Sequence, residues 1–153
     1  MLIRPLEDRD IPAAAALFQA AAREFIVHES PDGAPQFTAE NDEAGFRRHV
    51  AAGYVYHVAI VGDVLAGFVA VREVTHLYHL FVDKRWHRQG IARRLWEHGR
   101  DKALEAGNPG FFTVNASNFA LPLYTALGFV PTAPMQFKNS IYFTPMRLDL
   151  PRA

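Results

Sequence analysis

The 153-residue sequence contains no cysteine, no long hydrophobic run and no net charge. The absence of cysteine excludes disulfides, a thiolate metal site and an enzyme that works through a covalent S-acyl intermediate. No apolar stretch approaches the ~20 residues that a membrane-spanning helix needs, so we expect no membrane partner. Sixteen Lys and Arg residues balance sixteen Asp and Glu residues, which argues against a nucleic-acid partner.

Hydrophobic residues make up half of the sequence and aromatic residues 12%, so a chain of this length can bury a packed core as one domain. No internal repeat, low-complexity linker or shift in composition divides it, and we predict a single domain over residues 1–153. Five of the first ten residues are charged, which is unlike a secretory signal. We therefore expect a cytoplasmic location.

Although the net charge is zero, the sequence contains two segments of opposite charge. Residues 84–102 hold seven Lys or Arg and two Asp or Glu, whereas residues 24–43 hold six acids and no Lys or Arg. The first segment is suited to binding an anion and the second to binding a cation. Solvated helix faces would give the same pattern, so charge alone does not decide between these interpretations.

The order of apolar residues predicts helices packed on a mixed sheet. Asp10 and Thr38 are candidate N-caps of two helices, and a Gly62-Asp63 turn joins two strands. The predicted elements are a strand at 1–6, helices at 10–25 and 38–53, strands at 54–61, 64–72 and 73–82, a helix at 90–106, a strand at 111–115, a helix at 118–127 and two strands within 131–150. This order, β-α-α-β-β-β-α-β-α-β-β, predicts an α/β (α+β) fold with about seven strands and helices on both faces of the sheet.

The most informative stretch runs from residue 79 to residue 95, where a buried strand, a cationic turn and a helix follow one another. The N-terminus of a helix offers four unpaired N–H groups and about half a positive charge, which suit a phosphate oxygen. Gly90 and Ala92 leave room for a ligand, and Arg88, Arg93 and Arg94 supply positive charge. The spacing matches neither G-x-G-x-x-G nor the P-loop, which disfavours those two nucleotide sites.

Two motifs carry a family resemblance. Residues 80–82 (LFV) followed by 87–92 (HRQGIA) resemble the acyl-CoA signature Q/R-x-x-G-x-G/A of the GCN5-related N-acetyltransferase (GNAT) family. Residues 115–118 (NASN) and 121–129 (LPLYTALGF) resemble its N…Y-x-x-x-G-F element. The element order is also that of the family, so the resemblance covers essentially the whole chain. His87 departs from the pattern, because it stands where the family usually has Gln or Arg.

The resemblance implies a GNAT fold that binds acetyl-CoA between two strands that splay apart, one ending at Val82 and one beginning near Phe111. Backbone groups of Leu80 and Val82 would pair with the pantetheine arm, and residues 87–93 would hold the pyrophosphate. Asn118 would touch the cofactor, and it is also placed to cap the following helix. The implied cofactor-binding residues are Leu80, Phe81, Val82, His87, Arg88, Gln89, Gly90, Ile91, Ala92, Arg93 and Asn118.

Amide formation from a thioester needs a base for the amine proton and benefits from an acid for the departing thiolate. Tyr124 matches the position at which many family members carry the tyrosine that protonates the CoA sulfur. A phenol with a pKa of ~10 keeps its proton at neutral pH, so the chemistry fits. A core tyrosine on a short amphipathic helix is the alternative interpretation.

The base is predicted from strand alternation. His76 and His79 lie three residues apart on one strand, so regular alternation points them to opposite faces and excludes a paired metal site. Counted back from Val82, His76 faces the same way as Tyr78 and matches a position at which some family members carry a Glu or His linked to proton removal. A structural histidine is the alternative, and Glu73 and His79 are lesser candidates.

In this family the first two helices and their loop form the acceptor wall, which corresponds here to Glu24, Phe25, Glu29 and loop 30–37. The nearby acids favour a small cationic primary amine as acceptor. Three alternatives stay open: acetylation of a protein N-terminus or lysine, a non-catalytic acyl-CoA-binding regulatory domain, and a nucleotide-binding protein outside the family.

We expect acetyl-CoA as the co-substrate and no metal. The amine would attack directly in a ternary complex, because the chain lacks the cysteine that an S-acyl route needs. The strand within 141–150 is a candidate surface for pairing with a second copy to give a homodimer.

Overall fold

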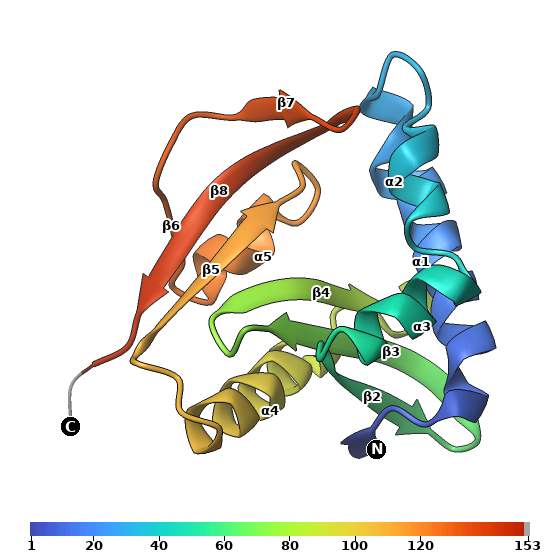
Figure 1. Ribbon diagram of the computed structural model, residues 1–153, viewed down its shortest axis with the longest axis vertical. Coiled ribbons are helices and arrows are strands. Elements are labelled where there is room, and N and C mark those ends of the chain that lie inside the picture. Colours follow the sequence, from blue (N-terminus) through green and yellow to red (C-terminus); the bar gives the residue numbers. More distant parts are fainter. Residues whose placement is uncertain (152–153) are drawn as a thin grey trace.

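The computed structural model describes residues 1–151, and the last two residues of the predicted domain lie outside that range. It shows the predicted class of fold, a mixed sheet with helices on both faces (Figure 1). The elements in chain order are β1 (Leu2–Pro5), η1 (Asp8–Asp10), α1 (Ile11–Phe25), η2 (Val27–Glu29), α2 (Pro35–Ala39), α3 (Glu43–Ala51), β2 (Val55–Val61), β3 (Val64–Arg72), β4 (His76–Val82), η3 (Lys84–Trp86), α4 (Ile91–Glu105), β5 (Phe111–Ala116), α5 (Leu121–Ala126), β6 (Val130–Pro131), β7 (Gln136–Lys138) and β8 (Ile141–Asp149), where η marks a 3₁₀ helix.

The strands lie in the order β1-β2-β3-β4-β5-β8-β6, and β7 pairs with β8. Every pair is antiparallel except β4 with β5. The sheet has eight strands rather than about seven. The C-terminal region contributes three strands in place of the two predicted, and β6 is only two residues long.

The helix predicted from Thr38 to Gly53 is two helices. Thr38 lies inside α2, and Asp42 caps α3 instead by accepting a hydrogen bond from the N–H of Gly45 at 2.8 Å. The apolar spacing hides the break, because Phe37 on α2 and Phe46 on α3 pack against the same cluster. As a separate short helix, α2 carries Phe37 to the wall of the cavity described below.

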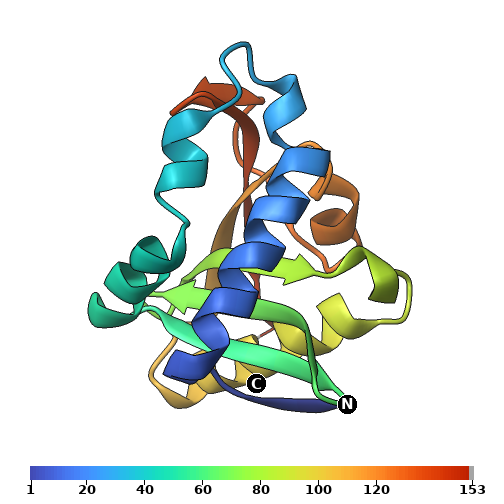
Figure 2. The ribbon, with the colours of Figure 1, turned by 90° about the vertical axis from the view of Figure 1, so that its right-hand side faces the viewer.

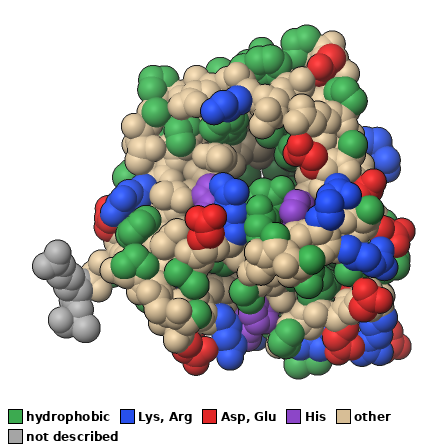
Figure 3. Space-filling view, viewed as in Figure 1, with side chains coloured by type: hydrophobic (Ala, Val, Ile, Leu, Met, Phe, Trp, Pro, Cys, Tyr) green, Lys and Arg blue, Asp and Glu red, His purple; other side chains and the backbone are tan. Residues whose placement is uncertain are grey.

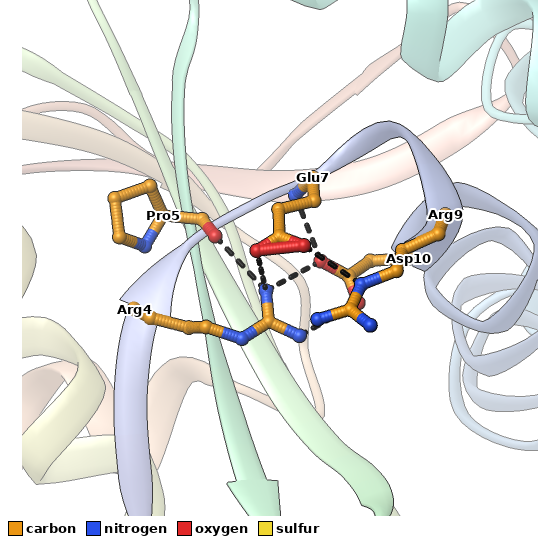
Figure 4. A network of polar contacts seen from close by, with 5 residues as sticks. All are labelled: Arg4, Pro5, Glu7, Arg9 and Asp10. Atoms are coloured by element: carbon orange, nitrogen blue, oxygen red, sulfur yellow. Dashed lines mark hydrogen bonds and ion pairs between the residues drawn. The ribbon is translucent and has the colours of Figure 1, made fainter.

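The carboxylate of Asp10 connects the first strand to the start of α1 through hydrogen bonds (Figure 4). It accepts hydrogen bonds from the Arg4 guanidinium at 2.7 and 3.0 Å and from the N–H of Glu7 at 2.8 Å. The Arg4 guanidinium holds the pKa of Asp10 below its ordinary value. Asp10 stands at the predicted N-cap position of α1, but its oxygens bond to Arg4 and Glu7 and make no cap bond to the helix.

Two hydrophobic clusters lie on opposite faces of the sheet. The helices α1 and α3 cover one face (Figure 2), where Phe18 and Phe46 are fully buried. The helices α4 and α5 cover the other, where Leu95, Trp96 and Tyr124 are buried. This arrangement fixes both faces of β4, the central strand on which the candidate site is built.

The strands β4 and β5 pair over a short stretch and then diverge. Only two residue pairs join them, His76 with Thr113 and Leu77 with Val114. Beyond this point β5 stays paired with β8 over Phe111–Ala116, while β4 stays with β3 (Figure 1). The predicted splay is confirmed, and it leaves the C-terminal half of β4 with one free edge.

A β-bulge in β4 changes the direction of its side chains. Ala70 on β3 pairs with His79 and Val71 pairs with Leu77, so Tyr78 is an extra residue in the ladder. Leu77 packs under α4, whereas Tyr78 and His79 both face the α1 side of the sheet. Two consecutive residues thus point the same way, which a regular strand does not allow.

Candidate active site

A cavity of about 770 Å³ opens where β4 and β5 part. Its walls come from the end of α1, from α2, β4 and β8, from the turn that starts α4, and from the segment between β5 and α5. Figure 3 shows the molecule hollowed on this face, with hydrophobic side chains inside the hollow. Among the described residues that line the cavity, none is Asp or Glu.

The edge of β4 that faces the cavity has no strand partner. Asp83 donates its N–H to the carbonyl of Ala66 on β3 at 2.7 Å. Alternation along an antiparallel ladder then turns the backbone groups of Phe81 toward β3 as well. The N–H and C=O groups of Leu80 and Val82 consequently point into the gap that β5 has left. They offer an extended edge to which a ligand with amide groups can pair.

The helix α4 begins at the cavity with free N–H groups. Gly90, its N-cap, has a φ of 79°, which glycine adopts without strain. The N–H of Arg94 bonds back to Gly90, and the N–H groups of Ile91, Ala92 and Arg93 precede the first bond within the helix. Such an N-terminus carries partial positive charge and suits an anion.

Positive side chains add to this effect. Of the predicted anion-binding residues 87–93, all except Gln89 line the cavity. Arg88 and Arg93 are among them, whereas Arg94 is not. The cationic segment of the sequence therefore contributes two arginines, the residue type best suited to phosphate, to the cavity wall at the start of α4. The guanidinium of Arg93 also donates to the carbonyl of Ala126 at 3.4 Å.

His87 holds the loop against the strand. Its Nε2–H donates a hydrogen bond to the carbonyl oxygen of Val82 at 2.7 Å. Its ring also lies 6.0 Å from that of Phe25, centroid to centroid. The residue that departs from the family pattern thus connects three parts of the cavity wall: the end of β4, the start of α4 and the end of α1.

Tyr124 supplies a protonated hydroxyl at the cavity. The residue is buried on α5, lines the cavity and packs edge-to-face on Phe129 at a centroid distance of 5.7 Å. Burial raises the pKa of its phenol above the ordinary value of 10. The hydroxyl therefore keeps its proton at neutral pH and can act as a donor.

Asn118 has a different contact from those predicted. It neither lines the cavity nor caps α5; its side-chain amide donates to Glu29 at 2.8 Å. Ser117 supports the start of α5 instead, because its hydroxyl accepts a bond from the N–H of Ala120 at 3.2 Å. Asn118 thus ties the residues before α5 to η2.

The six acids of residues 24–43 do not line the cavity. Of the predicted acceptor wall, Phe25 and, from the 30–37 segment, Phe37 line it, whereas Glu24 and Glu29 do not. Each acid has a partner within the protein: Glu24 with Lys84, Glu29 with Asn118, Asp32 with Ser30, Ser140 and the N–H of Ala34, Glu40 with Gln36, Asp42 with the N–H of Gly45, and Glu43 with Arg47. The acids counted in favour of a cationic acceptor are therefore paired outside the cavity lining.

His76 lies where β4 and β5 still pair, and it does not line the cavity. Its Nδ1 is hydrogen-bonded to the Thr113 hydroxyl at 2.8 Å, and burial, with the charge of Arg72, lowers its pKa to about 4. The prediction that His76 and His79 face opposite sides was wrong because the bulge at Tyr78 interrupts the alternation. It is His79 that reaches the cavity wall. A base role for His76 stays a prediction.

Some other aromatic residues of the cavity were not predicted. Phe119 precedes α5, and Tyr142 and Phe143 come from β8. The two segments lie far apart in the sequence and share no spacing. The apolar start of the strand at 141–143 is a local signal, but the sequence predicted that this strand could pair with a second copy.

Two further features concern metals and membranes. Within residues 1–151, no three His, Asp or Glu side chains come together in a way that would hold a metal ion. Over the same range, no helix is long and apolar enough to cross a membrane.

Comparison with known proteins gives a family and a fold. The family model for the acetyltransferase (GNAT) domain matches residues 14–150. A search of curated proteins found no match. A GCN5-related N-acetyltransferase from Rhodopseudomonas palustris is 22% identical, with a TM-score of 0.82, over 97% of this chain and 95% of that one.

Two other solved structures have the same fold. The PaiA N-acetyltransferase from Thermoplasma acidophilum, in complex with coenzyme A, is 13% identical over 97% of this chain and 98% of that one, with a TM-score of 0.74. The ribosomal-protein-S18-alanine N-acetyltransferase from Escherichia coli is 24% identical over 99% and 95%, with a TM-score of 0.70. At these identities the likeness concerns the fold.

The lowered pKa of His76 predicts a pH-dependent stability. The unfolded chain takes up a proton on this histidine near its ordinary pKa of 6.5, whereas the folded chain does so only near 4. The free energy of unfolding should therefore fall as the pH drops from 6.5 to 4, by about 2–3 kcal/mol for this group. His76→Asn should reduce that fall, and His28→Asn, at an exposed position, should not. Urea unfolding from pH 4 to 7.5 measures it, and equal slopes in both variants would contradict the prediction.

Proposed function

The chain belongs to the GNAT acetyltransferase family, and from this premise we propose that it acetylates a primary amine by direct attack on acetyl-CoA. It is an acetyl-CoA-dependent N-acetyltransferase. The observation that carries the proposal is a single cavity that joins the free edge of β4, the N-terminus of α4 and Tyr124. Because the sequence has no cysteine, no S-acyl intermediate can form, and both substrates must be held together.

The residues at the cavity fit acetyl-CoA. The backbone groups of Leu80 and Val82 would pair with the pantetheine amides, as a neighbouring strand would. The first turn of α4, with Arg88 and Arg93, would hold the diphosphate. The carbonyl of Val82 already accepts a bond from His87, but a carbonyl oxygen has a second lone pair for the ligand.

Substitutions of two neighbouring arginines test the diphosphate site. Arg93→Gln should raise the Kd for coenzyme A about tenfold, equivalent to about 1.4 kcal/mol, because it removes a guanidinium from the cavity wall. Arg94→Gln removes the same charge one residue away, outside the lining, and should change the Kd less than about twofold at physiological salt. Calorimetry measures both values, and equal weakening by the two variants would count against the site.

Tyr124 would act as the acid. As the amine attacks the thioester, the sulfur leaves as a thiolate and needs a proton, which the neutral phenol can donate. Burial keeps that phenol protonated. The N–H of Leu80, on the free edge of β4, would be available to polarise the thioester carbonyl.

Replacing Tyr124 by Phe should separate catalysis from binding. The variant keeps the ring that packs on Phe129, so the fold and the Kd for coenzyme A should be unchanged within about twofold, while kcat should fall about 10²-fold. Release of free thiol measures turnover, and thermal unfolding confirms the fold. An unchanged kcat would remove Tyr124 from the chemistry. A wild-type chain that binds coenzyme A but transfers acetyl to no amine would favour the regulatory alternative.

The acceptor end of the cavity favours an amine with an apolar body. The residues there are aromatic or aliphatic (Phe25, Ile26, Phe37, Tyr78, Tyr142 and Phe143). Among residues 1–151, no carboxylate lines the cavity to attract a polycation, and the Lys and Arg residues that line it are Lys84, Arg88 and Arg93. This chemistry supports an arylalkylamine, or a peptide N-terminus followed by an apolar side chain, over a polyamine.

A panel of acceptors with acetyl-CoA checks this assignment. Phenethylamine should show a kcat/KM at least about tenfold above that of spermidine, since burial of a phenyl ring contributes about 1.5–3 kcal/mol. A short peptide with a free N-terminus tests the macromolecular acceptor. Preference for spermidine would contradict the apolar assignment and restore the cationic one. Preference for the peptide over both small amines would favour a protein acceptor.

A further inference from the structure

We propose that Tyr56 and His49 form a proton relay that carries the amine proton from His79, at the cavity wall, to the half-buried edge of α3. The inference rests on the proposed function, because it assigns the base for the same amine. It concerns a hydrogen-bonded chain of four side chains, three of which come from strands β2 and β4 and one from α3.

The chain of contacts is continuous. The Tyr56 hydroxyl is hydrogen-bonded to Nδ1 of His79 at 3.0 Å and to Nδ1 of His49 at 3.3 Å. Nε2 of His49 then meets the hydroxyl of Tyr78 at 3.4 Å. Both Tyr78 and His79 line the cavity, so the chain begins and ends on it. The two links at His49 are the longest, and such bonds often shorten only when substrate binds.

The bulge in β4 makes this chain possible. Because Tyr78 is the extra residue, its side chain and that of His79 lie on one face with ring centroids 4.3 Å apart. Without the bulge one of the two would point toward α4. In the part of the chain that the structure describes, Nδ1 of His79 is bonded to Tyr56, and Nε2 has no protein partner. That nitrogen is free for a ligand in the cavity.

A series of proton transfers would move the positive charge from His79 to His49. His79 carries its proton on Nδ1 and accepts the amine proton on Nε2; its Nδ1 proton passes to the Tyr56 oxygen, and the Tyr56 proton passes to Nδ1 of His49. His79 and Tyr56 are neutral again, with His79 now protonated on Nε2, and His49 holds the positive charge. The half-buried His49 releases a proton to solvent. After the product has left, His49 takes up a proton again, the transfers run in reverse, and Nε2 of His79 releases its proton to the open cavity, which restores the original tautomer. No bond to carbon forms or breaks in these steps.

Burial explains why the charge should not stay on His79. Its ring lies 5.2–5.7 Å from those of Phe18, Phe46, Phe68 and Phe81, and burial lowers its pKa well below the ordinary value. Burial also raises the pKa of Tyr56, so its phenolate is not a resting state and its two protons move together. Only His49 is exposed enough to hold a charge.

The groups around His49 shift its pKa in opposite directions. Burial and the neighbouring Arg48 lower its pKa, whereas Glu40 raises it. The titratable and charged groups that face it are Arg48 on α3, Glu40 after α2, Tyr54 just before β2, Tyr56 on β2, and Tyr78 and His79 on β4, with Arg72 of β3 over the ring of Tyr78. At acid pH a protonated His49 blocks the relay, so kcat should fall there.

Two tyrosine variants test the relay. Tyr56→Phe keeps the ring and removes the hydroxyl that joins the two histidines. With the best amine of the panel, its kcat should be about 10²-fold lower at pH 7, with the deficit shrinking toward pH 9.5 as the free amine loses its proton in solution. Tyr54→Phe is the matched control, because Tyr54 stacks on His49 through its ring at 4.9 Å; its kcat should stay within about twofold. Equal kcat values for the two variants, or a deficit constant across pH, would overturn the relay.

A measurement on the wild-type chain needs no variant and no acceptor. Long-range ¹H–¹⁵N NMR spectra of the histidine rings should show His79 neutral at pH 7 with its proton on Nδ1. A proton on Nε2 would place a donor in the cavity and overturn the relay. If the wild-type chain acetylates no amine, the proposed function fails, and the tautomer of His79 then decides the relay by itself.

Discussion

The early parting of β4 from β5 is the constraint on which the site depends. Two residue pairs hold the strands together, His76 with Thr113 and then Leu77 with Val114, which marks the last point of contact. Beyond it β4 keeps β3 on one side and has no strand on the other, so the backbone groups of Leu80 and Val82 face the cavity. Polar backbone groups inside a protein are normally paired. His87 already bonds the carbonyl of Val82, and a molecule with amide groups in the cavity would complete the ladder.

The two faces of β4 divide the chemistry between them. On one side, α4 and α5 bring free N–H groups, the two cavity arginines and the Tyr124 phenol, which suit the phosphates and the leaving sulfur. On the other, α1, α2 and the bulge bring aromatic rings and His79, which suit the body of an amine and its proton. The thioester and the amine would therefore approach from opposite sides of the same strand edge, and positioning would supply much of the rate.

The sequence predicted the features that depend on short-range spacing, and it missed those that are set by distant residues. The turn before α4 and the position of Tyr124 follow from spacings within one strand–turn–helix or one short helix, and residues of both line the cavity. The bulge at Tyr78 was not foreseen, because one extra residue is set by the ladder with β3 and leaves no mark on β4 itself. The contacts of the acidic residues were likewise set by distant residues. Glu24 and Glu29 contact Lys84 and Asn118, which lie 60 and 89 residues further along the chain.

A crystal structure of the chain with coenzyme A tests the central claim most directly. The account predicts that the pantetheine amides hydrogen-bond to the backbone of Leu80 and Val82, with the sulfur beside the Tyr124 hydroxyl and the diphosphate at the first turn of α4. Coenzyme A bound elsewhere, with the edge of β4 closed by β5 or filled only by side chains, would contradict it.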